Sequence, residues 1–367
     1  MDLTKKKVTL ILLTFNESKN IVKILDEIIE FFHLYDLEII VIDDKSNDGT
    51  EELIRNYARN DSRVRLIKRF DRFGLASAIK EGCLCAVGDF ILIMDSDGQY
   101  QVNSAALALD SLISGNLDLI TGSRFQTQSS ITGLSRNRIK GSKIANHFAR
   151  YSLPNQYKMV TDYMTGLIAL RRATCMLYIE KIDISGFKFL YELLAVSKGK
   201  LKFKEIPLTF QRRDFGQSKF NYVVIWDFTM SLVYSYLGRV IPRKAVSYAA
   251  VGSIGVLVQL TITYLLIGLT NLDFEMVLPI AVVFAASSNF IINNFLTFRA
   301  NRLVYKSFFV GYLKFLLVSS LPIIANVGLA NFFYRSFSAN TFASQIAAIF
   351  IVFIWNYAAS SRLVWKN

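Results

Sequence analysis

The first half of the chain alternates short, continuously apolar runs with stretches of helical periodicity. The apolar runs are Lys7–Leu13, Leu37–Ile42, Val64–Ile67, Phe90–Met94 and Asp118–Thr121, and the helical stretches between them include Ser18–Phe32, Thr50–Asn60 and Leu75–Ala86. Runs that are apolar throughout are typical of strands covered on both faces. The alternation therefore predicts an α/β fold with a mostly parallel, doubly wound sheet.

The second half of the chain consists of longer apolar segments. Four of them can cross a bilayer as helices, which requires about 20 residues: Ala245–Ile267, Met276–Phe298, Phe308–Phe333 and Phe342–Leu363. These spans contain amides, which need partners in hydrocarbon, at Asn293, Asn294, Asn326 and Asn356. Four spans exceed what anchoring requires, so a passive anchor and a role in handling lipid both remain open for this four-helix transmembrane domain.

A third kind of segment joins the two halves. Asn221–Leu237 is apolar but contains Asp227, a tryptophan and three tyrosines, side chains that suit headgroup depth better than the bilayer core. We expect amphipathic interface helices here, with a helix of the soluble domain's own core as the alternative. The predicted domains are therefore residues 1–220, 221–244 and 245–367.

Composition and charge agree with a membrane protein. Of the 367 residues, 52% are hydrophobic, and the formal net charge is +13, which excludes a disordered chain and an ordinary soluble domain. Basic residues cluster before the first span, between the second and third, and after the fourth, and short basic loops stay cytoplasmic. We expect a multi-pass protein of the cell membrane with its soluble domain and both termini in the cytoplasm. Basic loops also suit anionic lipid headgroups, so nucleic-acid binding is disfavoured.

Polar side chains collect where the predicted strands end. Phe15-Asn16-Glu17 follows the first strand, Asp43 to Thr50 follows the second, and Asp95-Ser96-Asp97-Gly98-Gln99 follows the fourth. Ligands of doubly wound sheets bind at the carboxyl ends of strands. The glycine-rich signatures of dinucleotide-binding and P-loop folds do not occur. Two acids one residue apart, with an amide two residues on, can hold Mg²⁺ or Mn²⁺, although a turn or helix cap explains most such pairs.

Taken together in this order, these motifs resemble inverting glycosyltransferases of the GT-A fold, and specifically the polyprenyl-phosphate sugar synthases of the dolichyl-phosphate mannose synthase type. The resemblance covers nearly the whole chain, because the C-terminal part resembles the GtrA-like membrane domain. The motifs that carry it are LTFNESKNI (13–21), EIIVIDDKSNDGT (38–50), GLASAIKEG (74–82), MDSDGQ (94–99), GSRF (122–125) and TFQRRDFGQSKF (209–220).

The resemblance implies a site for each reactant. Donor nucleotide-sugar contacts fall on Leu13, Phe15, Glu17, Ile42, Asp44, Asp95, Ser96, Asp97, Gln99, Arg213 and Lys219, with Asp97 and Gln99 as ligands of Mg²⁺ or Mn²⁺. Acceptor-phosphate contacts fall on Arg124, Arg138 and Ser142. The implied catalytic set is Asp95, Asp97, Arg124, Arg138, Ser142 and Arg213. A phosphate acceptor is already an anionic nucleophile at neutral pH, since its second pKa is about 6, and cations are needed more than a general base.

The reaction implied is transfer of a hexose, mannose from GDP-mannose, to dolichyl (polyprenyl) phosphate with inversion, which gives dolichyl β-D-mannosyl phosphate. The alternatives are a UDP-glucose-dependent polyprenyl-phosphate glucosyltransferase and a non-catalytic protein that translocates or scaffolds lipid-linked sugar. The chain departs from the family pattern at Leu13 and Phe15, where Pro and Tyr are more common, and in the loop Asp162 to Gly166, which lacks a proline. Asp162 therefore receives no role here, and Lys188 and Glu192 are expected on a helix surface.

Overall fold

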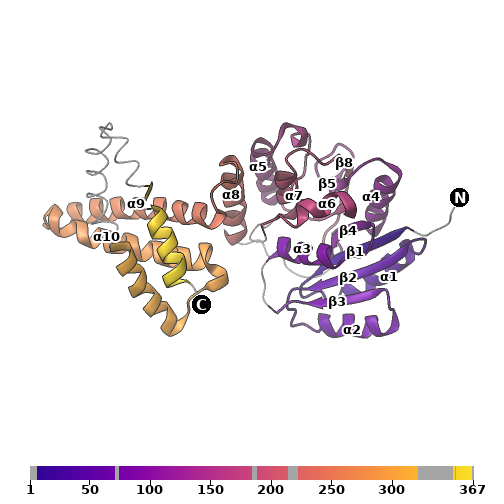
Figure 1. Ribbon diagram of the computed structural model, residues 1–367, viewed down its shortest axis with the longest axis horizontal. Helices are drawn as coiled ribbons and strands as arrows, with labels where there is room; N and C mark the ends of the chain where they lie inside the picture. The colour runs from indigo at the N-terminus through magenta and orange to yellow at the C-terminus, as the bar shows by residue number, and fades with distance from the viewer. Residues whose placement is uncertain are drawn as a thin grey trace. The chain divides into compact units, whose positions relative to one another are not determined.

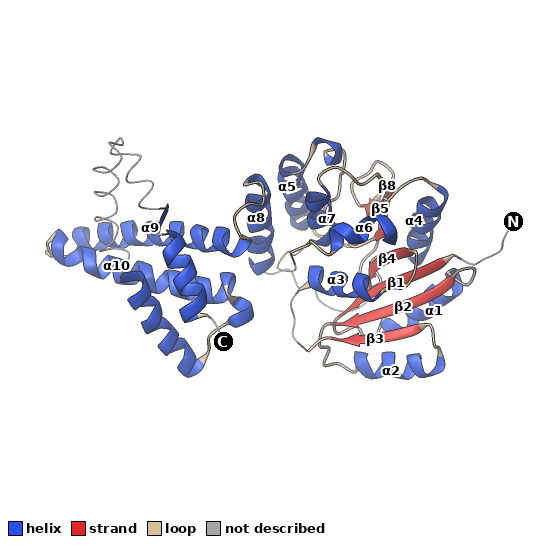
Figure 2. Cartoon of the chain, viewed as in Figure 1, coloured by secondary structure: helices blue, strands red, loops and turns tan. Residues whose placement is uncertain are grey.

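The computed structural model describes residues 6–70, 74–183, 188–213, 222–320, 350–351 and 353–365. Their contacts form two compact units, Met1–Tyr236 and Leu237–Asn367. The first unit contains a seven-stranded sheet in the order β3-β2-β1-β4-β7-β5-β8 (Figures 1 and 2). Its strands are β1 (Lys7–Thr14), β2 (Asp36–Asp43), β3 (Val64–Lys68), β4 (Phe90–Asp95), β5 (Leu119–Ser123), β7 (Ile168–Arg171) and β8 (Phe203–Pro207).

All neighbouring strands of this sheet pair in parallel except β7, which is antiparallel to both β4 and β5. A second, two-stranded sheet pairs β6 (Ser130–Ile131) with β9 (Thr209–Phe210). The helices of the unit are α1 (Ile21–Phe31), α2 (Thr50–Asn60), α3 (Leu75–Cys85), α4 (Val102–Ser114), α5 (Arg136–Ser152), α6 (Arg172–Ile179), α7 (Phe189–Ser197) and α8 (Tyr222–Tyr236). The predicted α/β fold with a mostly parallel sheet is confirmed.

Both faces of the central strands are buried, which explains their continuous apolar sequence. Val8, Leu10 and Leu12 of β1 belong to the core with α1, α2 and α4, whereas Ile11 and Leu13 belong to the core with α3, α6 and α7. Side chains alternate between the faces of a strand, so a strand covered on both faces must be apolar at every position.

Close helix packing on one face depends on a glycine of α3. A Cβ atom at Gly82 would lie 2.6 Å from Ile42 and 2.8 Å from Ile11. The absence of that atom lets α3 approach the ends of β1 and β2, where the candidate site begins.

Helix α8 packs on the first unit with one side only. Phe228 makes an edge-to-face contact with Tyr191 of α7, at 5.7 Å between ring centroids, and Leu232 joins the core on that face. On the other side, Tyr222 and Val233 are exposed. The sequence analysis gave both possibilities for this segment, and its inner face is part of the soluble unit's core. Its position at a membrane surface remains a prediction.

The second unit is helical. It contains α9 (Arg243–Leu269), α10 (Phe274–Ile292) with a π-helical turn at Asn293–Thr297, helical residues over 305–320, and a last helix that ends in a π-helical turn at Ser360–Val364. Within the described residues, two helices, Arg243–Leu269 and Pro279–Thr297, are long and apolar enough to cross a membrane. The third and fourth predicted spans lie partly outside the described residues, as does Asn326, so the number of spans remains a prediction.

The ends of these helices meet at a buried asparagine. The Oδ1 atom of Asn294 accepts hydrogen bonds from Leu303 N (2.8 Å) and Trp365 Nε1 (3.1 Å), and its Nδ2 atom donates to Leu303 O (3.0 Å). Trp365 stacks on Phe298 with ring centroids 4.3 Å apart. A fully buried amide whose oxygen and nitrogen are both hydrogen-bonded is typical of polar packing between membrane helices.

Candidate active site

The loops that follow β1 and β2 are joined by hydrogen bonds. Asn16 N donates to Ser46 Oγ (2.8 Å), and Asn47 N donates to Asn16 Oδ1 (3.0 Å). Asn16 has φ +57°, a conformation that asparagine tolerates better than most residues. Glu17 N donates to Thr50 Oγ1 (2.9 Å) at the start of α2. These bonds hold the predicted donor residues after β1 and β2 at one edge of the sheet.

An arginine not identified from the sequence lies next to Asp44. Arg69 follows β3, its side chain is 4% exposed, and its Nη1 atom lies 3.0 Å from Asp44 Oδ1. The same guanidinium contacts Glu81 (3.1 Å) and Ser77 (2.5 Å) of α3. Its place two residues after the predicted strand Val64–Ile67 was the signal in the sequence. Arg69 therefore fixes the orientation of the carboxylate that the family resemblance places at the nucleotide base.

The serine between the two aspartates joins strand ends. Ser96 Oγ donates to Leu13 O (2.8 Å) and lies 2.9 Å from Thr14 Oγ1, while Ser96 N donates to Leu13 O (3.2 Å). Ser96 is 1% exposed. Its hydroxyl thus holds the end of β4 against the end of β1, and its predicted donor contact remains a prediction.

Asp97 and Gln99 converge on one partner, Arg213. Arg213 Nη2 lies 2.5 Å from Asp97 Oδ2, and Arg213 Nε donates to Gln99 Oε1 (3.0 Å). The backbone next to Arg213 is joined to Gln99 as well, since Gln211 N donates to Gln99 O (3.0 Å) and Gln99 Nε2 donates to Gln211 O (3.2 Å). The predicted donor residue Lys219 lies outside the described residues.

This arrangement fits a hard divalent cation. One guanidinium contacts a carboxylate oxygen of Asp97 and the amide oxygen of Gln99, so both oxygens face the same cationic side chain. Among the described residues, no three His, Cys, Asp or Glu side chains form a metal cluster. The protein would therefore supply a partial set of oxygen ligands, which Mg²⁺ and Mn²⁺ accept together with phosphate and water oxygens.

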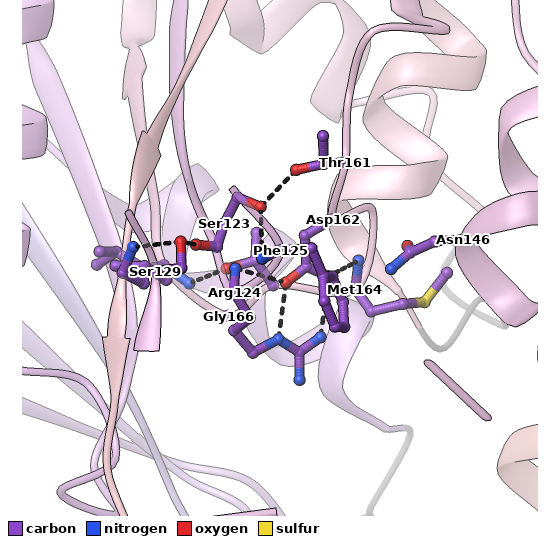
Figure 3. A network of polar contacts seen from close by, with 12 residues as sticks. Ser123, Arg124, Phe125, Ser129, Asn146, Thr161, Asp162, Met164 and Gly166 are labelled. Atoms are coloured by element: carbon purple, nitrogen blue, oxygen red, sulfur yellow. Dashed lines mark hydrogen bonds and ion pairs between the residues drawn. The ribbon is translucent and has the colours of Figure 1, made fainter. Parts of the chain in front are cut away.

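Arg124 of the GSRF motif is held by Asp162, which the sequence analysis left without a role. Arg124 Nε and Nη2 donate to Asp162 Oδ2 (2.7 Å) and Oδ1 (2.9 Å), and the backbone N of Arg124 also donates to Oδ2 (3.2 Å; Figure 3). Asp162 is 0% exposed. Although burial acts to raise it, these contacts with Arg124 hold the pKa of Asp162 below its ordinary value. The carboxylate fixes the Arg124 side chain by a two-point contact.

Other cationic side chains interact electrostatically with Arg124 of this ion pair. Burial and the neighbouring Arg213 and Arg124 lower the pKa of Arg138. Burial and Arg124 also lower the pKa of Lys188 to about 8, while Asp95 acts in the opposite direction. Three arginines, Arg124, Arg138 and Arg213, and Lys188 therefore act on one another through their charges, and a set of interacting cations favours binding of a phosphate. Ser142 lies one helical turn after Arg138 on the same face of α5.

Asp95 lies between the acidic and basic parts of the site. Burial and the charge of Asp97 raise the pKa of Asp95 to about 7, and Lys188 counters this shift. A Cβ atom on Gly166 would lie 2.6 Å from Asp95 Oδ2. Gly166 N also donates to Tyr100 Oη (2.7 Å). The loop that ends at Gly166 therefore leaves room for the Asp95 carboxylate.

The expectation that Lys188 and Glu192 lie on a helix surface was wrong. Glu192 is 1% exposed, and Lys188 Nζ donates to Met164 O (3.4 Å) beside the cationic group. Helix α7 packs against α3 and α6, and its Tyr191 contacts Ser152 of α5 and Phe228 of α8, none of which the local sequence revealed. Loops that are distant in sequence bring the carboxylates of Asp162 and Asp95 to these cationic side chains.

Comparison with known proteins identifies the family. Residues 9–183 match the glycosyl transferase family 2 model, and residues 247–365 match the GtrA/DPMS transmembrane domain. The chain belongs to glycosyl transferase family 2: it is a glycosyltransferase with a GT-A-type domain joined to a membrane domain.

Two relatives extend the match along the chain. A dolichol-phosphate mannosyltransferase from Pyrococcus furiosus is 30% identical over 318 residues, which are 84% of this chain and 85% of the relative. A polyprenol monophosphomannose synthase from Mycolicibacterium smegmatis is 30% identical over 227 residues, 59% of this chain and 82% of the relative. A crystal structure of glucosyl-3-phosphoglycerate synthase from Mycobacterium tuberculosis with Mn²⁺, UDP and glucosyl-3-phosphoglycerate has a TM-score of 0.49 and 19% identity, covering 64% of this chain and 80% of that chain.

Proposed function

We propose that this protein transfers mannose from GDP-mannose to a polyprenyl phosphate such as dolichyl phosphate, with inversion at the anomeric carbon. The observation that carries the proposal is the meeting of two groups at one edge of the sheet. Asp97 and Gln99 form an oxygen pair for a metal-bound diphosphate, and Arg124 and Arg138 lie beside it with Lys188. Two relatives named for mannosyl transfer to such lipids support the choice of sugar and acceptor.

On the donor side, the protein binds and orients the nucleotide-sugar. Asp44, held by Arg69, is placed to accept a base N–H, and Glu17 is fixed by its backbone bond to Thr50. A divalent cation held by Asp97 and Gln99 supplies charge stabilisation to the leaving diphosphate when bound. Arg213, which already reaches both residues, is positioned to contact the same phosphates.

On the acceptor side, cations hold the nucleophile. In the transfer, an oxygen of the lipid phosphate forms a bond to the anomeric carbon while the bond from that carbon to the diphosphate oxygen breaks, so the nucleoside diphosphate leaves. The phosphate is largely dianionic at neutral pH, since its second pKa is about 6, and it needs no strong base. Arg124 and Arg138 lower the repulsion between two anionic reactants, and the two-point contact with Asp162 keeps Arg124 in place.

The membrane domain gives the enzyme access to its lipid. We place four spans in the bilayer with the catalytic domain and both termini on the cytoplasmic side, because the basic loops fall on one side of the predicted spans. The long isoprenoid acceptor then remains in lipid while its phosphate reaches Arg138.

The experiment is a transfer assay with full-length protein in detergent. Dolichyl phosphate and Mn²⁺ or Mg²⁺ are supplied with labelled GDP-mannose, UDP-glucose or UDP-N-acetylglucosamine, and label is counted in the organic phase. We expect label from GDP-mannose alone and a β-linked product by NMR. Label from UDP-glucose alone would replace the mannose assignment with the glucosyltransferase alternative, and no transfer by protein that binds nucleotide and lipid would favour translocation or scaffolding.

A matched pair of variants on α5 tests the acceptor site. Arg138 is partly buried beside Arg124 and Arg213, whereas Arg136 is exposed two residues earlier. Arg138→Gln is expected to raise the KM for dolichyl phosphate about tenfold or more, because a charge-assisted contact contributes about 1.5–3 kcal/mol. Arg136→Gln is expected to leave that KM within about twofold, as for an exposed charge. Equal effects of the two variants would contradict the assignment of Arg138.

A further inference from the structure

A guanidinium contacts both oxygens that the proposed function assigns to the metal. Arg213 Nη2 lies 2.5 Å from Asp97 Oδ2, and Arg213 Nε donates to Gln99 Oε1 (3.0 Å). The Asp97 side chain is 6% exposed and the Arg213 side chain 27% exposed. The contact is therefore largely shielded from water on the carboxylate side, where a charge-assisted bond is strongest.

The contact is built into the fold around it. Gln99 and Gln211 exchange hydrogen bonds through Gln211 N and Gln99 Nε2, and Tyr100 pairs with Phe210 in a β-bridge. The rings of Tyr100 and Phe210 also meet edge to face, with centroids 5.2 Å apart. Three residues after Phe210, the chain reaches Arg213, whose Nη2 atom lies 2.5 Å from Asp97 Oδ2.

We propose that Arg213 competes with the divalent cation for Asp97 and Gln99, and that the donor diphosphate resolves this competition. An oxygen lone pair directed at a guanidinium N–H is not available to a metal ion, and two cations on one carboxylate repel each other. Cation binding therefore requires Arg213 to leave the ligand pair. The diphosphate offers Arg213 a new anionic partner at the same place, so metal and nucleotide bind cooperatively.

This inference rests on the proposed metal site and adds a role to Arg213 beyond contacting the donor. The guanidinium keeps the Asp97 and Gln99 oxygens converged when no metal is bound, and it makes the metal site weak until a nucleotide arrives. The sign of the Arg213 contribution to metal affinity is then opposite with and without nucleotide. If Arg213 only supported the fold, its replacement would weaken metal binding both with and without nucleotide.

The test measures Mn²⁺ affinity of the full-length protein in detergent by electron paramagnetic resonance of free Mn²⁺. Wild type, Arg213→Gln and the control Arg212→Gln are titrated without nucleotide and with saturating GDP. Arg212 is the exposed neighbour on the same segment. Without nucleotide, Arg213→Gln should bind Mn²⁺ about tenfold more tightly than wild type, the fold-change of one charge-assisted contact at a partly exposed site. With GDP this advantage should reverse, and Arg212→Gln should follow wild type throughout.

Two outcomes would overturn the inference. The first is Mn²⁺ binding to Arg213→Gln that equals or is weaker than wild type without nucleotide. The second is Mn²⁺ binding by Asp97→Asn that is as tight as in wild type. That result would show that Asp97 is not a ligand of the metal. Failure of the proposed mannosyl transfer is seen separately, as absence of labelled lipid from a protein whose Mn²⁺ titrations show the expected sign change.

Discussion

Replacing Asp162 by Asn tests how Arg124 is held. Asp162 is 0% exposed and accepts hydrogen bonds from Arg124 N, Nε and Nη2, and also from Met164 N (3.2 Å). Asparagine keeps the shape and removes the charge, so the guanidinium of Arg124, whose side chain is 9% exposed, loses its counter-ion. Breaking one side of a buried ion pair costs about 3–5 kcal/mol.

Part of that cost is offset by aromatic rings. The Arg124 guanidinium lies 5.4 Å from the Phe125 ring centroid and 5.5 Å from that of Phe210, and such contacts contribute about 0.5–1 kcal/mol each at partly exposed sites. We expect a net destabilisation of about 3 kcal/mol. For a domain of this size, 1 kcal/mol shifts Tm by about 2–4 °C, so the first unit should melt about 6–12 °C lower.

The assay is thermal denaturation in detergent, with a surface ion pair as the matched control. Asp61 and Arg63 also make a two-point contact (2.9 and 2.6 Å), but their side chains are 18% and 40% exposed. Asp61→Asn should cost about 1 kcal/mol or less. The double variant Asp162→Asn with Arg124→Gln should recover part of the lost Tm, because it removes the uncompensated cation. Equal Tm shifts for the two aspartate variants, or no recovery in the double variant, would refute the reasoning.

Three further predictions concern other parts of the chain. Gly166→Ala would bring a Cβ to 2.6 Å from Asp95 Oδ2, and this overpacking costs about 1–3 kcal/mol. If the Asp95 carboxylate moves as a result, kcat/KM should fall about 5- to 150-fold. An unchanged kcat/KM would show that Asp95 does not act in the reaction. Asn294→Ala leaves Trp365 Nε1 and two backbone groups without their partner, so the membrane unit should lose about 3 kcal/mol or more, and an unchanged melting profile would contradict this. The folded-state pKa of Asp162 is depressed, so its stabilisation is present above its unfolded pKa of about 3.9 and is lost as the pH falls through the lower folded value; the Tm difference between wild type and Asp162→Asn should therefore shrink below about pH 4, and a constant difference would be incompatible with that linkage.

The fold was predictable because its strands are buried on both faces. In a soluble unit, a continuous apolar run such as that of β1 indicates a strand covered on both faces. The predicted run Lys7–Leu13 agrees with the observed strand Lys7–Thr14 to within one residue. The first helix was less well placed, since the sequence analysis began it at Ser18 and the structure begins it at Ile21. The turn before it is closed by Asn20, whose Nδ2 atom donates to Glu17 Oε2 (2.7 Å), a local side-chain bond that periodicity does not reveal.

The site was predictable where function lies at strand ends and less so where it depends on partners. Asp97 and Gln99 follow a buried strand, and the family resemblance assigned them to the metal; this assignment remains a prediction. Arg69 was missed because it acts on Asp44, which is distant in sequence. Asp162 received no role because its loop lacks the family's proline, and its contact with Arg124 is visible only in the structure. A sequence motif shows which functional groups are present, but not which acidic side chain pairs with which basic one.

The sequence by itself determined the division into a soluble α/β unit and a membrane unit, since apolar periodicity and segment length depend only on the order of residues. It also determined the family, through motifs that keep their order along the chain. Only the tertiary structure decided that Glu192 is buried, that Asp162 holds Arg124, and that Arg213 contacts both Asp97 and Gln99. The physical reason is that burial and electrostatic partnership are properties of packed surfaces, which bring together loops and helices that the linear pattern keeps apart.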